Sequence, residues 1–137
     1  MDNIMLAFHH IGVACRDIEK TKVFYIETLG YSAAPTVNDP LQRVKVCFLA
    51  KDGEPRIELL EPVDETSPVN RTLKTVGVSP YHLCYEVDDI SLAVAELREQ
   101  RFLLVSGPVP ACAMDGNKVA FMYSKKNGLI ELVEKSR

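Results

Sequence analysis

The sequence has no tryptophan, few aromatic residues and no long hydrophobic run. An aromatic share of 7% is too low for the stacking surfaces that bind single-stranded nucleic acids. A net charge of −3 provides no positive excess for a phosphate backbone, and no apolar run approaches the ~20 residues of a transmembrane helix. No basic stretch precedes the apolar run at residues 4–8, so we expect no secretory signal. We therefore expect a cytoplasmic protein that binds neither nucleic acid nor membrane.

Cysteine is also sparse, with four residues and no Cys-x-x-Cys pair: Cys15, Cys47, Cys84 and Cys112. Without an export signal, we expect four reduced thiols rather than disulfides or a zinc ribbon. The chain has 137 residues, of which 47% are hydrophobic, and this is enough to bury the core of an ordinary globular domain.

The chain contains an internal repeat. Residues 9–18 resemble residues 81–90, and His10 is separated from His82 by 72 positions. Residues 45–48 resemble 118–121 and residues 57–61 resemble 130–134, with an offset of 73 positions from Glu58 to Glu131. The nearly constant offset predicts two homologous modules, at residues 4–62 and 78–135, joined by a helical connector at residues 63–77 within one compact domain.

Each module carries the signals of a β-α-β-β-β unit. Asp17 and Asp89 follow a short apolar strand and stand at helix N-cap positions. Three strand candidates then follow in each module, at residues 31–36, 43–50 and 55–61 and at residues 102–106, 117–123 and 128–134. Asp52-Gly53 and Asn127-Gly128 are hairpin-turn dipeptides between the last two strands of each module. The sequence therefore predicts an α+β fold of paired βαβββ modules that form a curved mixed-sheet cup.

Four polar residues lie inside these apolar strands at equivalent repeat positions: His10, Glu58, His82 and Glu131. Because side chains alternate across a strand, their apolar neighbours face the helices and the four polar side chains face the other side. Two imidazoles and two carboxylates that converge there need a compensating charge, which a divalent cation supplies. Such a ligand set suits Zn, Ni, Co or Mn, so the pattern predicts one metal ion held by these four residues.

Other polar residues near these strands are not assigned to the site. His9 has the opposite strand parity from His10. Glu61 and Glu134 stand at strand ends, where carboxylates are usually exposed. Glu86 shares parity with His82, and we treat it as a residue of the surrounding strand rather than as a ligand.

These motifs resemble those of the vicinal oxygen chelate superfamily, which includes glyoxalases, bleomycin-resistance proteins and extradiol dioxygenases. Within it, the methylmalonyl-CoA epimerase branch is most similar. The resemblance rests on residues 9–14, 57–62, 64–68, 82–90, 118–121 and 129–134, and it spans almost the whole chain.

The resemblance implies a function. It implies a homodimeric, metal-dependent isomerase, epimerase or lyase that removes a proton alpha to the carbonyl of a small carbonyl or thioester substrate. The metal-ligand positions of the family fall on His10, Glu58, His82 and Glu131, and the catalytic base falls on Glu131. Glu58 is the symmetric second candidate for the base.

The sequence also departs from the epimerase branch. The branch uses an additional acid near the strand at residues 41–47, but this stretch has no carboxylate, and Asp39 is the nearest. Its glycine- and histidine-containing loops are replaced by residues 112–118 and by Tyr123-Ser124-Lys125. Lys125 and Lys126 could meet a phosphate, although paired loop lysines are usually just solvated.

Three alternatives to an epimerase remain. A glyoxalase I-type lactoylglutathione lyase is the nearest enzyme. A ring-cleaving dioxygenase is disfavoured because Glu58 occupies a position that oxygen needs. A non-enzymatic drug- or metabolite-binding protein of the bleomycin-resistance type would lack the metal quartet. Stoichiometric metal content separates this binder from the enzymes.

Overall fold

The computed structural model describes residues 6–136, which divide into two compact units. The N-terminal unit is His10–Tyr81, and the C-terminal unit combines residues 6–9 with residues 82–136. Most of each repeat inferred from the sequence lies in one unit, although residues 6–9 of the first repeat belong to the C-terminal unit and residues 78–81 of the second belong to the N-terminal unit. The predicted start of the first module, at residue 4, lies outside the described residues.

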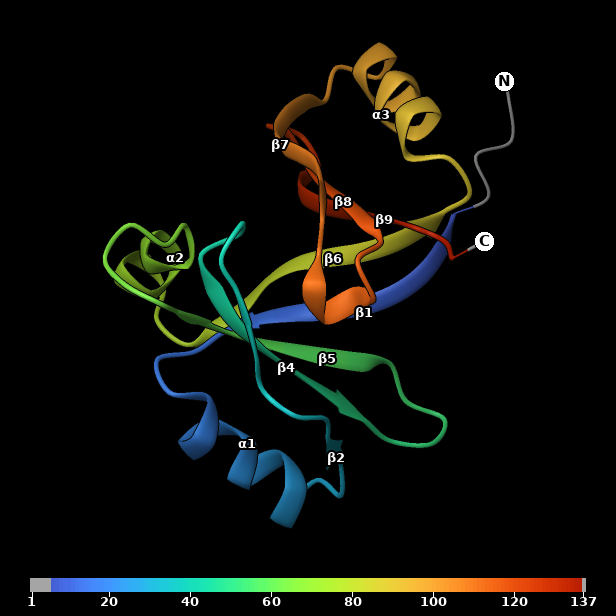
Figure 1. Cartoon of the computed structure of the whole chain (residues 1–137). Helices are drawn as coiled ribbons and strands as arrows, with labels where there is room; N and C mark the ends of the chain where they lie inside the picture. Colours follow the sequence, from blue (N-terminus) through green and yellow to red (C-terminus); the bar gives the residue numbers. More distant parts are fainter. Residues whose placement is uncertain (1–5, 137) are drawn as a thin grey trace. The chain divides into compact units, whose positions relative to one another are not determined.

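In the N-terminal unit, the first and last strands are parallel neighbours, and a helix and three shorter or antiparallel strands lie between them in the sequence. The unit contains most of β1 (Ala7–Ala14), followed by α1 (Ile18–Glu27), β2 (Ser32–Ala33), β3 (Val37–Asp39), β4 (Val44–Ala50), β5 (Arg56–Pro62) and α2 (Val69–Thr75). Strand β5 lies between β1, which is parallel to it, and β4, which is antiparallel. Strands β2 and β3 both pair with β4. Helix α1 lies against one side of this sheet (Figure 1).

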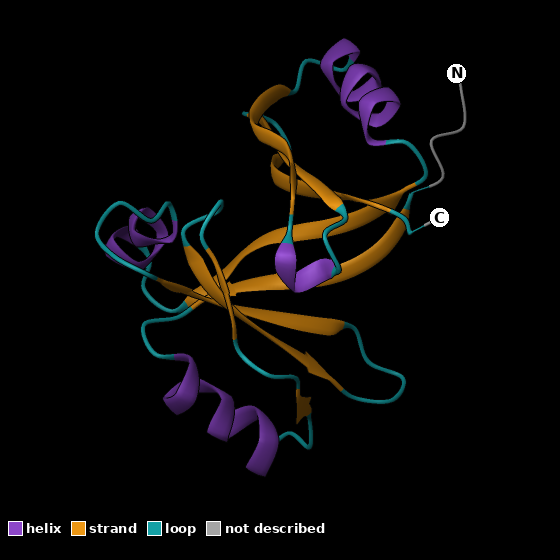
Figure 2. Ribbon diagram, in the orientation of Figure 1, coloured by secondary structure: helices purple, strands orange, loops and turns teal. Residues whose placement is uncertain are grey.

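The C-terminal unit repeats this plan. It contains most of β6 (Ser79–Val87), followed by α3 (Ile90–Glu99), β7 (Leu103–Pro110), the short 3-10 helix η1 (Cys112–Met114), β8 (Lys118–Ser124) and β9 (Gly128–Glu134). Strand β9 lies between β6, which is parallel to it, and β8, which is antiparallel. Helix α3 covers one face of these strands (Figure 2). The predicted βαβββ order is therefore present in both units.

The third element of each repeat differs from its predicted length. Of the strand predicted at residues 31–36, only the two-residue β2 is observed, and a further short strand, β3, follows at residues 37–39. Pro35 lies between them and has no backbone N–H to continue the ladder. The strand predicted at residues 102–106 extends to Pro110 as β7, with irregular register between Leu104 and Val109. Gly107 has φ +82°, and a Cβ there would lie 2.3 Å from the carbonyl oxygen of Val119. Only glycine lets β7 approach β8 this closely.

Strand alternation produces one apolar core per unit, on the helix-facing side of the sheet. The N-terminal core consists of Val13, Cys15, Ile18, Cys47, Leu49 and Leu59. The C-terminal core consists of Val87, Ile90, Ala93, Val94, Leu97, Phe102, Ala120, Met122 and Leu132. The helical face predicted after Asp89 is thus buried as expected.

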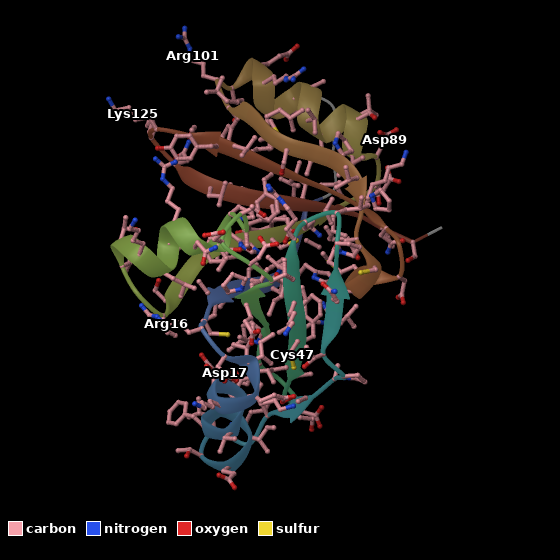
Figure 3. The ribbon with its side chains drawn as sticks, turned by 60° about the vertical axis from the view of Figure 1, so that its left-hand side comes forward. Arg16, Asp17, Cys47, Asp89, Arg101 and Lys125 are labelled. Atoms are coloured by element: carbon pink, nitrogen blue, oxygen red, sulfur yellow. The ribbon has the colours of Figure 1, made fainter. Side chains whose placement is uncertain are left out.

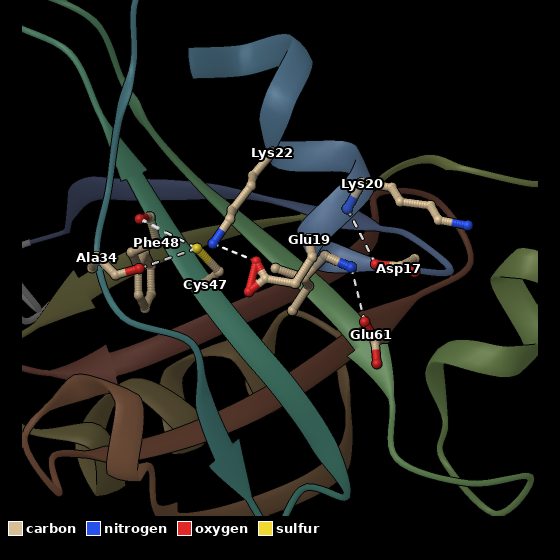
Figure 4. Close-up of polar contacts among 9 residues, drawn as sticks. Asp17, Glu19, Lys20, Lys22, Ala34, Cys47, Phe48 and Glu61 are labelled. Atoms are coloured by element: carbon tan, nitrogen blue, oxygen red, sulfur yellow. Dashed lines mark hydrogen bonds and ion pairs between the residues drawn. The ribbon is translucent and has the colours of Figure 1, made fainter. Parts of the chain in front are cut away.

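Two carboxylates accept hydrogen bonds from the first backbone amides of each long helix. The predicted N-caps are confirmed, since Asp17 accepts a hydrogen bond from the Lys20 amide and Asp89 accepts one from the Leu92 amide. Figure 3 labels both aspartates at the start of their helices. A glutamate from the last strand adds a second acceptor, because Glu61 bonds the Ile18 amide at 2.8 Å (Figure 4).

Glu134 repeats this contact, bonding the Ile90 amide at 3.0 Å. Both glutamates are half-buried rather than exposed as expected. A carboxylate there satisfies an otherwise unbonded amide and interacts favourably with the positive end of the helix dipole.

None of the four cysteines, all of which lie within residues 6–136, forms a disulfide, as the sequence predicted. Cys15, Cys47 and Cys84 are buried and Cys112 is exposed. Burial raises the pKa of the Cys15 thiol to about 11. The Cys47 thiol donates to the carbonyl oxygen of Ala34 at 3.3 Å (Figure 4), and burial raises its pKa as well. These buried thiols behave as small hydrophobic side chains. No helix within residues 6–136 has the length and hydrophobicity required to cross a bilayer.

Candidate functional site

The N-terminal unit holds a buried imidazole–carboxylate pair. His10 lies on β1 and Glu58 on β5, the two parallel neighbours in the sheet. His10 Nε2 lies 3.1 Å from Glu58 Oε1, and the two residues are 0% and 3% exposed. Their neighbours Val13 and Leu59 belong to the core on the helix side. The alternation of the two strands therefore places this pair on the sheet face opposite α1.

The C-terminal unit holds an equivalent pair. His82 lies on β6 and Glu131 on β9, again two parallel neighbours. His82 Nε2 lies 3.1 Å from Glu131 Oε1, and the residues are 4% and 2% exposed. The repeated sequence thus produces the same polar contact, on the same strands, in both units.

The chemistry of this donor set fits a divalent cation. A buried carboxylate must be compensated by charge or by hydrogen bonds, and the imidazole beside it supplies one contact. Imidazole nitrogen and carboxylate oxygen are common ligands of zinc and of neighbouring transition metals. Each unit therefore carries a candidate pair of metal ligands. Binding of a single ion by all four residues stays a prediction.

A phenylalanine packs against each imidazole. The His10 and Phe48 rings have centroids 5.2 Å apart and an interplanar angle of 81°. The His82 and Phe121 rings have centroids 5.1 Å apart and an angle of 90°. The sequence marked both phenylalanines only as anchors of the repeat. Their position in the same Lys-Val-x-Phe motif was the signal that could have linked them to the site.

Asp39, the nearest carboxylate to the strand at residues 41–47, is held in a turn. Its Oδ1 accepts hydrogen bonds from the amides of Leu41 and Gln42, and its Oδ2 accepts one from the Gln42 side chain. The residue is 1% exposed. Asp39 therefore stabilises the β3–β4 turn, and these contacts explain its burial without a catalytic role.

The two lysines that could meet a phosphate lie just beyond the C-terminal end of β8. Lys125 and Lys126 are exposed in the turn between β8 and β9, and Lys125 projects from the ribbon in Figure 3. The Ser124 hydroxyl closes this turn by accepting a hydrogen bond from the Asn127 amide at 2.8 Å.

Comparison with known proteins identifies the family. The model of the glyoxalase/bleomycin resistance protein/dioxygenase superfamily matches residues 9–121. The chain belongs to this superfamily. The resemblance read from the sequence motifs is therefore confirmed, as is the α+β fold of paired βαβββ modules.

Curated members of the superfamily that are similar to this chain include two epimerases. The mitochondrial methylmalonyl-CoA epimerase of Mus musculus is 35% identical over 127 residues, which cover 90% of this chain and 70% of that protein. The ethylmalonyl-CoA/methylmalonyl-CoA epimerase of Cereibacter sphaeroides is 33% identical over 127 residues, which cover 90% of this chain and 94% of that protein. These relatives support an epimerase-type function.

A solved superfamily structure is similar over nearly the whole chain. It is a methylmalonyl-CoA epimerase variant of Streptomyces coelicolor in complex with 2-nitronate-propionyl-CoA. It is 28% identical with a TM-score of 0.83, and the match covers 97% of this chain and 100% of that one. That relative therefore binds a ligand that carries coenzyme A.

Proposed function

We propose that this protein is a metal-dependent epimerase that acts on an acyl-CoA thioester by proton transfer at the carbon alpha to the carbonyl. In this proposal, His10, Glu58, His82 and Glu131 bind one divalent cation, which is Zn, Ni, Co or Mn. The main support is the repetition of one buried His–Glu pair, at 3.1 Å in each unit, in a chain similar to methylmalonyl-CoA epimerases.

The carboxylates supply the proton transfer. Glu131 accepts the alpha proton, and Glu58 is the second candidate for this role because it occupies the equivalent place in the other repeat. Inversion of a carbon centre requires removal of a proton from one face and its return to the other, which two carboxylates can perform. A cation bound by these residues supplies positive charge that stabilises the negative charge developing on the substrate's carbonyl oxygen.

No third acid takes part in the proposed proton transfer. Asp39 hydrogen-bonds to its own turn, so the two buried glutamates are the carboxylates that we assign to the reaction. We further propose a homodimer, as the superfamily resemblance implies, and a cytoplasmic location. The four cysteines form no disulfide within the described residues, which supports a reducing compartment. Light scattering of the purified protein tests the dimer.

One experiment tests the activity and the metal together. Purified protein is analysed for metal and incubated in deuterium oxide with a panel of acyl-CoA thioesters and hemithioacetals. We expect about one divalent ion per chain and deuterium at the alpha carbon of a methylmalonyl-type thioester. Turnover of hemithioacetals alone would instead indicate a glyoxalase I-type lyase. Ligand binding without metal and without exchange would indicate a bleomycin-resistance-type binder.

Two variants test the assigned residues. His82→Ala is expected to lose the bound metal, and Glu131→Gln is expected to lose deuterium exchange. Glu134→Gln is the matched control, because it makes the same change on the same strand but retains an oxygen acceptor for the Ile90 amide. Full metal content and full exchange in both test variants would refute the assignment.

A further inference from the structure

We propose that Phe48 and Phe121 are positioning residues that hold the two imidazoles in the orientation that binds the cation. This inference rests on the proposed function and adds two residues that are not ligands. It also gives a role to the Lys-Val-x-Phe motif, which marks the repeat at residues 45–48 and 118–121.

The contact is the same in both units. Each phenylalanine meets its histidine nearly perpendicularly, with centroids 5.2 Å apart for Phe48 and 5.1 Å apart for Phe121. Perpendicular packing is a favoured geometry of aromatic pairs, because the edge of one ring carries partial positive charge and the face of the other partial negative charge. Such packing restrains the plane of the imidazole as well as its position.

Strand register explains how the contact forms. Phe48 on β4 is directly opposite Glu58 on β5, while His10 lies one strand further, on β1. Phe121 on β8 is likewise opposite Glu131 on β9, with His82 on β6 beyond it. The β1 partner of Glu58 is Gly12 and the β6 partner of Glu131 is Cys84, so each histidine lies two residues out of line with its phenylalanine. Each phenylalanine therefore reaches diagonally across the glutamate strand to an imidazole two strand spacings, or ~10 Å, to the side. One ring thus lies beside both proposed ligands of its unit.

Phenylalanine suits this role because of what it lacks. Its ring has no hydrogen-bond donor or acceptor, so it cannot compete with Glu58 or Glu131 for the imidazole Nε2 atoms. Residues that orient metal-binding histidines affect metal affinity without touching the metal. A purely structural role would instead require only apolar volume, which leucine also supplies.

Cobalt titration separates these two roles. Co²⁺ is added to metal-free Phe121→Leu and Phe48→Leu, and binding is followed by visible absorption, which also reports ligand geometry. We expect Co²⁺ to bind about tenfold more weakly than to the wild type, with a shifted absorption band.

The matched control is Phe102→Leu. Phe102 is a buried phenylalanine of the same unit, but it packs in the core on the α3 side of the sheet. Its replacement is expected to lower the melting temperature and to leave Co²⁺ affinity and absorption unchanged. A fall in affinity with Phe102→Leu equal to that with Phe121→Leu would assign the effect to general destabilisation and overturn the inference.

Two further outcomes would refute the positioning role or the metal site. Wild-type affinity and spectrum in both leucine variants would refute the positioning role while leaving the proposed metal site intact. Failure of the wild type to bind Co²⁺ would refute the metal site and this inference together.

Discussion

The two units have the same side-chain contacts on the polar face of the sheet and bury different numbers of helix residues on the other face. On the polar face, each has a His–Glu pair at 3.1 Å and a perpendicular phenylalanine. On the helix face, α3 buries Ile90, Ala93, Val94 and Leu97, whereas Ile18 is the one residue of α1 that is fully buried. Within this chain, the two repeats therefore match more closely around the candidate ligands than around the helices.

The first prediction tests whether the histidines of the two polar faces contribute equally to metal binding. His10→Ala and His82→Ala should each weaken binding of a divalent cation by more than about 100-fold, because each removes one of four proposed ligands. Calorimetric titration of the metal-free protein with Zn²⁺ measures the effect. His9→Ala is the control, since it removes the neighbouring imidazole, and it should retain wild-type affinity. A large loss in only one of the two ligand variants would break the equivalence of the units.

The second prediction concerns β7, which has no counterpart of equal length in the N-terminal unit. Gly107→Ala should destabilise the protein by about 4 kcal/mol, because a positive φ and a backbone clash at 2.3 Å add together. Gly53→Ala has a similar φ of +77° and no atom within 4 Å of the added Cβ, so it should cost only about 1 kcal/mol. Urea denaturation measures both changes. Equal costs would mean that the close approach of β7 to β8 does not require glycine.

The third prediction compares the stability lost on removing a buried side chain of α3 with that lost on removing an exposed side chain of α1. Leu97→Ala removes a buried side chain of α3 and should cost about 3 kcal/mol through lost apolar contact and a cavity. Phe24→Ala removes a larger side chain of α1 that is 55% exposed, and it should cost less than about 1 kcal/mol. A larger loss in Phe24→Ala, measured in the same denaturation experiment, would mean that the exposed side of α1 is covered in solution.

The fourth and smallest effect is a dependence on alkaline pH. Burial raises the pKa of Cys15 from 9.0 to about 11, so the unfolded chain loses this proton at lower pH than the folded chain. The corresponding stability is present below pH 9 and is lost as the pH rises towards 11. Cys15 stands where the other repeat has Val87, which does not titrate. Cys15→Val should therefore reduce the fall in melting temperature between pH 8.5 and 10.5, and an unchanged fall would exclude the thiol as its source.

Most elements of the fold could be predicted because their signals are local. Asp17 and Asp89 identify the helix starts, and the apolar positions after Asp89 have the spacing of one helical face. The incorrect strand bounds occur where the length of a strand depends on the strand it pairs with. Pro35 interrupts the ladder within residues 31–36, which were predicted as one strand, and β7 extends beyond its predicted end because β8 provides a pairing partner.

The candidate site was predictable only in part. His10, Glu58, His82 and Glu131 were identifiable because a polar residue inside an apolar strand, repeated at a constant offset, stands out against its neighbours. Phe48 and Phe121 were not, because an apolar residue in a strand gives no such contrast. Glu61 and Glu134 looked like exposed strand ends, since their helix-capping contacts span 43 and 44 residues of sequence.

The sequence by itself determined the duplication, the order of elements in each repeat and the residue types available as ligands, because these follow from alternation, capping and composition within a few residues. The tertiary structure decided which atoms meet. Parallel pairing of β1 with β5 and of β6 with β9 sets each imidazole 3.1 Å from its carboxylate, and the register of β4 and β8 brings a phenylalanine to each imidazole. Register depends on contacts between strands that are distant in the chain, and a local pattern does not contain that information.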